Sequence, residues 1–308
     1  MKIFLVAPNE NWILDRIKKE WIQINPQLTT DNVNEADIVW LVSPLHWLAL
    51  PKPILENKKI VATIHHIVPE KFTSNNLREF VFRDQFVDQY HVPCQKTKDF
   101  ISKITKKPIN VVGYWYNSDF WYPENKEQCR QELEIPSDLF VVGSFQRDTE
   151  GHDLKSPKLE KGPDLFIESL KKMNRDDLFV LLGGWRRQYI MGRLDDLDIP
   201  YKFIEMAPLD TLRKMYASCD LYIVSSRCEG GPQALLEASA MRVPIISTNV
   251  GMAPVVLNER CINNIPENIY FPLDEDIEWC YNNVKKFELR NCIKKYEEMF
   301  FNIEQEKA

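Results

Sequence analysis

The sequence predicts an α/β protein built from two parallel-sheet domains, and three observations support this prediction. Short apolar, β-branched segments alternate with segments of helical hydrophobic period, which is typical of parallel strands joined by crossover helices. The chain has 308 residues, 44% of them apolar, and a single core rarely grows beyond about 250–300 residues. A polar, turn-rich segment, residues 117–138, separates two such alternating halves.

The N-terminal half opens with an apolar strand followed by an amphipathic helix, the usual start of a Rossmann-like domain. Its expected strands are residues 2–7, 37–43, 59–64, 89–92 and 110–114. Its expected helices are residues 13–25, 77–86 and 95–104.

The segment 117–138 is expected to be a linker that carries one short helix, and the second half follows it. The expected strands of this half are residues 139–145, 178–182, 201–205, 221–225, 244–247 and 268–271. Its expected helices are residues 163–173, 209–217, 233–241 and 277–287, followed by a charged amphipathic helix at 291–304. The pattern predicts two Rossmann-like domains with a cleft between them.

Composition excludes several classes of protein. A net charge of −6 argues against a nucleic-acid-binding protein, which needs an excess of basic residues. The seven cysteines are scattered and include no Cys-x-x-Cys pair, so we expect free thiols in a reducing cytoplasm rather than disulfides or a metal site. Neither a signal peptide nor a run of 18 apolar residues is present, and we expect a cytoplasmic protein.

A glycine-containing loop between a buried strand and a helix is the most informative segment. Glu229, Gly230 and Gly231 form the loop, and Pro232 stands at the helix start, where its missing N–H is not needed. Glycines let a ligand approach backbone N–H groups, and the helix dipole adds about half a positive charge, so the loop favours a phosphate. Glu237 lies about two helical turns further, so both carboxylates can address one elongated ligand.

These residues resemble the retaining GT-B glycosyltransferases of family 4, the glycosyl transferases group 1. The mark of that family is Glu-x7-Glu, and Glu229, Gly230 and Glu237 match it; the resemblance covers residues 139–272. It implies a GT-B fold in which Glu229 contacts the donor sugar and Glu237 binds the nucleotide ribose. It also implies that the backbone at Gly230 and Gly231 holds the donor pyrophosphate.

The family also uses an Arg and a Lys-Gly pair to grip the donor phosphates, and Arg147 and Lys161 are the corresponding residues here. Fixed cations of this kind can stabilise a departing diphosphate without a metal ion, so no metal or other cofactor is expected. The family usually places the two basic residues closer together than the 14-residue interval found here. A surface salt bridge is the alternative role for Arg147.

Members of the family often place a histidine at the end of one N-terminal strand, facing the donor sugar. His65 and His66 end the predicted strand at 59–64 and are the corresponding candidates for a catalytic role beside Glu229. The alternative for either residue is a structural histidine whose ring nitrogens are bonded within the domain.

Other N-terminal candidates are less specific. In place of the family's glycine-rich loop after the first strand, the chain has residues 8–12, where Asn9 and Trp12 offer side chains to an acceptor. His46 and Trp47 are further candidates for contact with an acceptor in the cleft, since aromatic faces suit sugars, with packing in the core as the alternative.

The resemblance implies a retaining glycosyltransferase that moves a sugar from a nucleotide-diphosphate sugar to a hydroxyl of a glycan or lipid-linked saccharide, in surface polysaccharide or glycoconjugate synthesis. The expected acceptor domain is residues 1–125, with the final helix in 288–308 packing back on it, and the expected donor domain is residues 126–287. Contact with the inner face of a membrane stays open. The alternatives are a catalytically inactive nucleotide-sugar-binding protein and another GT-B enzyme, such as an epimerase or phosphorylase.

Overall fold

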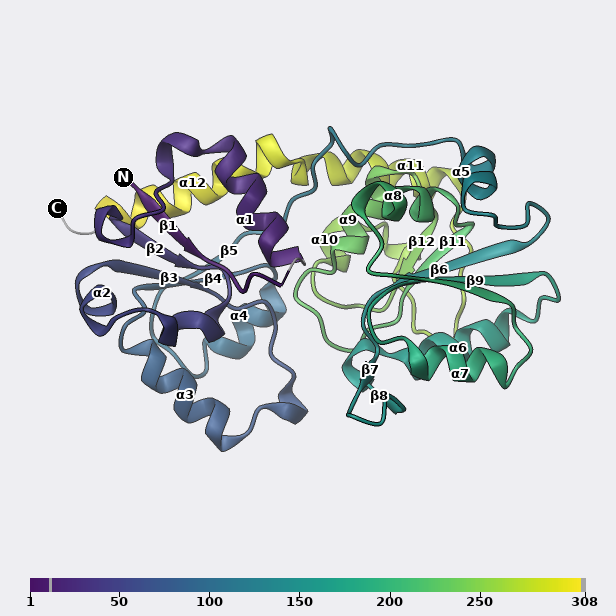
Figure 1. Ribbon diagram of the computed structural model, residues 1–308, viewed down its shortest axis with the longest axis horizontal. Helices are drawn as coiled ribbons and strands as arrows, with labels where there is room; N and C mark the ends of the chain where they lie inside the picture. Colours follow the sequence, from purple (N-terminus) through teal and green to yellow (C-terminus); the bar gives the residue numbers. More distant parts are fainter. Residues whose placement is uncertain (11–12, 306–308) are drawn as a thin grey trace. The chain divides into compact units, whose positions relative to one another are not determined.

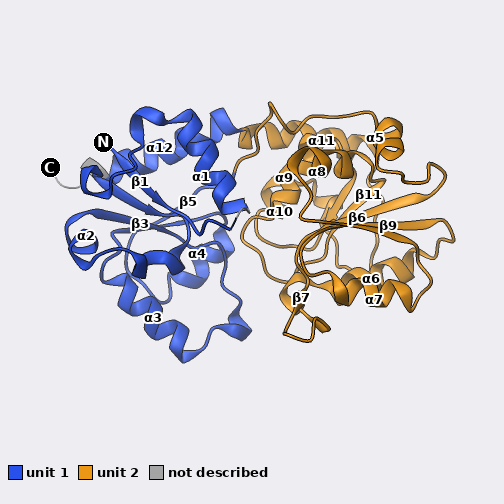
Figure 2. Cartoon of the chain, viewed as in Figure 1, with its two compact units in different colours: residues 1–114, 289–308 blue, residues 115–288 orange. Residues whose placement is uncertain are grey.

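The chain divides into two compact units, each with its own parallel sheet (Figure 2). The structure, a computed structural model, describes residues 1–10 and 13–305. Unit 1 comprises residues 1–114 and the C-terminal segment from Leu289, and unit 2 comprises residues 115–288. Each unit holds one five-stranded parallel sheet, which confirms the predicted α/β class with two Rossmann-like sheets.

The sheet of unit 1 has the order β1-β2-β3-β4-β5. Its strands are β1 (Ile3–Val6), β2 (Ile38–Leu41), β3 (Lys59–Thr63), β4 (Gln89–Val92) and β5 (Ile109–Val111). Its helices are α1 (Ile13–Ile24), α2 (Lys52–Asn57), α3 (Ser74–Asp84), α4 (Gln95–Ile101) and α12 (Leu289–Gln305). After α1 the chain makes a single parallel bridge, Ile3 to Thr29, beyond β1 before it enters β2 on the other side. The winding therefore reverses between β1 and β2.

Side chains of β2 pack in the apolar layers on both faces of the unit 1 sheet. Helices α1 and α12 cover one face of the sheet (Figure 1). Trp40 lies on this face, because its ring centroid is 5.4 Å from that of Trp21 on α1 and 5.2 Å from that of Phe300 on α12. Val39 and Leu41 belong to the apolar cluster of the other face. Since successive strand residues point to opposite faces, one short strand contributes to both cores.

The C-terminal helix α12 is part of unit 1. The Cys292 thiol and the Tyr296 hydroxyl both donate to the Gly113 carbonyl, at 3.2 and 3.3 Å. The predicted boundary between residues 125 and 126 lies too late, because the segment from Trp115 onward packs on unit 2. Within that segment, the Trp121 ring contacts Tyr216 edge-on at 5.7 Å.

The sheet of unit 2 has the order β10-β9-β6-β11-β12. Its strands are β6 (Phe140–Phe145), β9 (Leu178–Gly184), β10 (Tyr201–Glu205), β11 (Leu221–Val224) and β12 (Ile245–Ser247). A separate two-stranded hairpin is formed by β7 (Thr149–Glu150) and β8 (Ser156–Pro157). The helices are α5 (Lys126–Glu132), α6 (Pro163–Met173), α7 (Gln188–Asp195), α8 (Leu209–Ala217), α9 (Gln233–Ala240), α10 (Ala253–Val256) and α11 (Asp274–Val284).

Helices α6 and α7 cover one face of this sheet, and α8, α9 and α11 cover the other (Figure 1). The chain runs from β6 outward through β9 to β10 and then returns to β11 and β12. The winding direction therefore reverses between β6 and β11, which makes the carboxyl ends of these two strands the topological switch point of unit 2.

One predicted strand of the second half is wrong. Residues 268–271 form no strand, and the Asn268 N–H instead donates to the Asn264 carbonyl at 3.0 Å in a turn. Pro266 and Pro272 bracket this segment, and proline cannot donate to a sheet ladder. The β7–β8 hairpin and α7 were not predicted.

Among the helices of the described residues, none has both the length and the apolar character that a membrane crossing requires.

A fully buried histidine, His91 on β4, is held neutral in the core of unit 1. Its Nε2–H donates to the Val112 carbonyl at 2.8 Å, and its Nδ1 lies 3.0 Å from the Thr63 hydroxyl. That hydroxyl oxygen also accepts a hydrogen bond from the Trp40 indole, so its own hydrogen is directed to His91. Burial lowers the pKa of His91 from the ordinary 6.5 to about 4.

This depressed pKa makes the stability of the protein dependent on pH. Between pH 6.5 and about 4 the unfolded chain binds a proton at His91 that the folded chain does not, so the free energy of unfolding falls as the pH falls through this window. We expect His91 to contribute about 3 kcal/mol of this loss. The free energy of unfolding should be measured with urea at several pH values. Its fall with pH should be smaller in His91→Gln than in wild type, and it should be unchanged in His152→Gln, a control at an exposed position. Equal losses in all three proteins would contradict this assignment.

Candidate functional site

The candidate site lies in unit 2, where the carboxyl ends of β6 and β11 meet. Open α/β sheets bind ligands in the crevice outside such a switch point. Gln146 and Arg147 follow β6 directly, and the segment 225–232 follows β11 and leads into α9. Both predicted phosphate-binding segments therefore start at the same edge of the sheet.

Lys161 and Glu229, which are far apart in the sequence, form an ion pair at this edge. Their side chains are 18% and 11% exposed, so the pair is only partly accessible to water. The Ser226 hydroxyl donates to the same Glu229 oxygen at 3.2 Å. The carboxylate is thus fixed by one cation and one hydroxyl, as a group that positions a ligand should be.

Glycine at 162 allows Lys161 to approach the Glu229 loop. Gly162 has φ +60°, and a Cβ there would lie 1.9 Å from the Ser225 carbonyl oxygen. The turn that holds Lys161 is also bonded to the loop, because the N–H groups of Arg227 and Cys228 both donate to the Glu160 carbonyl, at 2.9 and 3.1 Å. A residue with a side chain at 162 would force these two backbones apart.

The predicted pyrophosphate loop is supported from the neighbouring strand. Gly230 is buried and Gly231 is half-buried. The loop after β12 contacts Gly230 through Gly251, which has φ +53° and where a Cβ would lie 2.3 Å from the Gly230 carbonyl oxygen. This packing fixes the backbone that enters the N-terminus of α9, where an anion is favoured.

Glu237 lies on α9 and is 3% exposed. The hydroxyl of Tyr216, on α8, donates to its Oε2 at 2.9 Å. Burial, followed by the charge of Glu237, raises the pKa of Tyr216 well above its usual value, so the phenol stays a hydrogen-bond donor. Tyr216 in turn packs against the Phe145 and Tyr222 rings, at 4.8 and 5.1 Å. The carboxylate is therefore held on a rigid aromatic support.

The long interval between Arg147 and Lys161 is closed by the β7–β8 hairpin. Thr149 pairs with Pro157, and the Lys158 N–H donates to the Asp148 carbonyl at 2.8 Å. The additional residues therefore loop out, and the chain returns to the neighbour of Arg147 three residues before Lys161.

Arg147 itself lies over an aromatic ring. Its guanidinium stands 4.8 Å from the centre of the Trp185 ring, and its Nε–H donates to the Thr149 carbonyl at 3.5 Å. Trp185 follows β9, so its ring comes from the same edge of the sheet. Arg147 therefore makes a cation–π contact with Trp185, and this contact differs from the surface salt bridge that was the alternative role for Arg147.

A fully buried ion pair anchors the root of this hairpin. Arg187 donates to Asp148 at 2.6 Å and also to the Gly183 carbonyl, at 2.6 Å, and to the Ser144 carbonyl and hydroxyl. Both charged side chains are 0% exposed. Arg187 therefore joins the ends of β6 and β9 to the residue that follows Arg147.

In unit 1, His65 uses both ring nitrogens within its own unit. Its Nε2–H donates to the Val42 carbonyl at 2.8 Å, and its Nδ1 accepts from the Tyr114 hydroxyl. Burial lowers its pKa to about 4, so the ring is neutral at pH 7. His65 can contact a sugar only by giving up one of these partners, which favours its structural alternative. His66 is half-buried and adjacent, and it stays a candidate.

The other N-terminal candidates separate into different roles. Trp47 is 4% exposed, donates to Glu79 at 3.0 Å and packs against Phe82 and Phe86, so its ring belongs to the core and offers no face to a sugar. His46 is half-buried, with Nδ1 3.0 Å from the Ser43 hydroxyl.

The side-chain carboxylate of Asp15 holds the loop after β1 in place. Asp15 accepts hydrogen bonds from the backbone N–H groups of Asn9 and Glu10, at 3.0 and 2.6 Å. These two donors are therefore occupied, and only the Asn9 side chain stays a candidate for an acceptor. Trp12 lies outside the described residues.

Residues 155–264 match the family model described as Glycosyl transferases group 1. The matched segment contains Lys161, Glu229 and Glu237. These similarities support a group 1 glycosyltransferase.

The chain is also similar to enzymes of O-antigen synthesis. The chain is 24% identical over 296 residues to the O-antigen chain mannosyltransferase RfbU of Salmonella typhimurium, covering 87% of this chain and 77% of that one. It is 20% identical over 274 residues to the O-antigen biosynthesis glycosyltransferase WclY of Escherichia coli, covering 85% and 75%. HepE of Anabaena, solved with UDP-glucose, has a TM-score of 0.74 at 15% identity, covering 97% of this chain and 99% of that one. The fold is GT-B.

Several residues of the site were missed from the sequence. Lys158, Ser226 and Tyr216 contact or surround the predicted carboxylates. Lys158 and Tyr216 stand in segments without a distinctive motif, whereas Ser226 lies three residues before Glu229 in the motif segment itself. Gly151, with φ +80° in the turn between β7 and β8, was the available signal for the hairpin that brings Lys158 into place.

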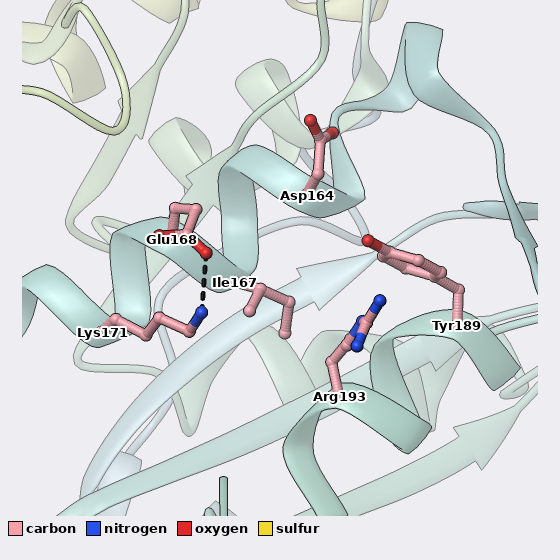
Figure 3. Close-up of a pocket in the computed structure, with 6 residues that line it drawn as sticks. All are labelled: Asp164, Ile167, Glu168, Lys171, Tyr189 and Arg193. Carbon is pink, nitrogen blue, oxygen red and sulfur yellow. Dashed lines mark hydrogen bonds and ion pairs between the residues drawn. The ribbon is translucent and has the colours of Figure 1, made fainter. Parts of the chain in front are cut away.

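A surface hollow of about 270 Å³ lies between α6 and α7 but has no link to the predicted chemistry (Figure 3). It is lined by Asp164, Ile167, Glu168, Lys171, Tyr189 and Arg193. Lys171 pairs with Glu168 at 2.7 Å, and Asp164 pairs with Arg227 at 2.6 Å. None of the predicted site residues lines it, so we do not assign it as the donor site.

Proposed function

We propose that this glycosyltransferase moves a sugar, with retention of configuration, from a nucleotide-diphosphate sugar to a hydroxyl of a glycan or lipid-linked saccharide. The observation that carries the proposal is the Lys161–Glu229 pair at the switch point of unit 2, beside the Gly230–Gly231 loop and the N-terminus of α9. One cation, one carboxylate and a glycine loop suit a ligand with phosphate next to sugar hydroxyls.

Each group has a chemical part in this proposal. Glu229 accepts hydrogen bonds from the donor sugar, and Glu237 accepts them from the ribose. Lys161 and the backbone at Gly230 and Gly231 offset the negative charge that grows on the diphosphate as the glycosidic bond breaks. Because the Lys161 cation and these backbone N–H groups are fixed in the protein, we propose that no metal ion is needed.

The acceptor and the location extend the same proposal. RfbU and WclY are named for O-antigen synthesis, and this supports a polysaccharide or lipid-linked oligosaccharide acceptor bound by unit 1. We place the reaction in the cytoplasm, at the inner face of a membrane where the acceptor is lipid-linked. HepE, solved with UDP-glucose, supports a UDP-sugar as the first donor to test.

Melting temperatures with UDP, GDP, ADP, CDP and dTDP, each with and without magnesium, test donor binding. We expect a rise with at least one diphosphate, equal with and without metal, because a ligand at about 100 times its Kd stabilises by roughly 2.7 kcal/mol. No rise with any diphosphate would contradict the proposal, and a rise only with magnesium would contradict its metal-independent part. Binding without hydrolysis or transfer of the matching nucleotide sugar would favour the inactive binding protein.

A further inference from the structure

Lys158 is close enough to the Lys161–Glu229 pair for both charges to act on it, although neither the sequence pattern nor the family motif selects it. It follows β8 directly, and its backbone N–H is bonded to Asp148, so the β7–β8 hairpin determines its position. Its side chain is 25% exposed, unlike that of Lys155 in the same hairpin, which is exposed. The fold therefore withdraws Lys158 from water in part.

The charges around Lys158 do not balance. Its ammonium lies 3.8 Å from the carboxylate of Glu160, a long ion pair, and Glu229 is paired with Lys161 at closer range. Arg147, Lys158 and Lys161 bring three positive charges against the two negative charges of Glu160 and Glu229. Burial lowers the pKa of Lys158, and the positive charges of Lys161 and Arg147 lower it further, while Glu160 and Glu229 oppose this shift without cancelling it. A bound anion would stabilise the charged form of such an ammonium group.

We propose that Lys158 is a third cation of the donor site and binds the diphosphate of the nucleotide sugar alongside Lys161. This inference rests on the proposed function and makes it more specific. A diphosphate offers two adjacent phosphoryl groups and therefore a contact for each lysine, whereas a nucleoside monophosphate sugar offers one. The two lysines thus select donors that leave as nucleoside diphosphates.

Binding of nucleoside diphosphates and monophosphates to Lys158→Met tests this inference. We expect the affinity for the diphosphate that wild type binds best, among UDP, GDP and ADP, to fall roughly 10- to 100-fold. The affinity for the matching monophosphate should change less than threefold, and Lys158→Arg should recover much of the diphosphate affinity. Lys155→Met removes the same charge from an exposed position of the same hairpin, and this control variant should bind both ligands as wild type does.

The unliganded variant gives a second readout that a merely structural lysine would not give. Removing one of three neighbouring cations relieves repulsion, so Lys158→Met should melt at the same temperature as wild type or higher while it loses diphosphate affinity. Unchanged diphosphate affinity in this variant, or an equal loss for monophosphate, would overturn the inference while the proposed function stands. If wild type itself binds no nucleoside diphosphate, the proposed function fails first.

Discussion

Replacing Glu229 with glutamine is expected to lower the rate of sugar transfer at least about 100-fold while the protein stays folded. The carboxylate forms an ion pair with Lys161 and accepts a hydrogen bond from Ser226. Glutamine has the same shape and can still accept from Ser226, but it carries no charge to orient Lys161 or to contact the donor sugar as an anion. The rate should be measured with saturating nucleotide sugar, so that the loss reflects the reaction and not donor affinity.

A matched surface residue controls for a general effect of the substitution. Glu168 on α6 also pairs with a lysine, Lys171, but both side chains are about half exposed, at 50% and 45%. Glu168→Gln should transfer sugar at the wild-type rate, since exposed pairs contribute little. If Glu229→Gln retained more than about a tenth of the wild-type rate, the proposed role of Glu229 would be wrong.

Replacing Arg187 with methionine is expected to lower the free energy of unfolding by about 3–5 kcal/mol. The substitution leaves the Asp148 carboxylate buried without its cation and removes the bonds that Arg187 gives to the ends of β6 and β9. Desolvation raises the pKa of Asp148 even in the presence of Arg187, as expected for a carboxylate that has no exposed surface. Urea unfolding followed by circular dichroism gives the change directly.

An exposed bidentate pair provides the comparison for this loss. Arg175 contacts both oxygens of Asp177, at 2.8 and 2.7 Å, on the surface of the same unit. Arg175→Met should change the free energy of unfolding by less than about 1 kcal/mol. The double variant Arg187→Met with Asp148→Asn should recover part of the loss, since no uncompensated charge is then buried. Equal effects of Arg187→Met and Arg175→Met would show that burial of the pair is energetically unimportant.

The parallel-sheet architecture could be predicted because strands buried on both faces are nearly continuous apolar runs. The apolar runs at 178–182 and 221–225 were predicted as strands, and they form β9 and β11, in which every residue is buried. Short elements with little apolar content were not predicted. The β7–β8 hairpin has two residues in each strand. The false strand at 268–271 is a largely apolar run between two prolines, and it follows a turn in which the Asn268 N–H donates to the Asn264 carbonyl.

The site could be predicted only where one local segment contains its chemistry. Glu229, the two glycines and Glu237 lie within nine residues, and the sequence alone locates them on a loop and the following helix. Lys158 and Tyr216 reach the site through a hairpin and a neighbouring helix, and such contacts depend on the tertiary fold. His65 shows the converse, because its strand-end position is the expected one while its two hydrogen bonds are visible only in the structure.

The most direct test of the central claim is a crystal structure of the chain with the nucleoside diphosphate that stabilises it most. We expect the diphosphate at the switch point of unit 2, with the Lys161 ammonium and the backbone N–H groups near Gly231 within about 3 Å of its oxygens. Glu237 should contact the ribose. A nucleotide bound elsewhere, in unit 1 or in the hollow between α6 and α7, would contradict the assignment of the donor site.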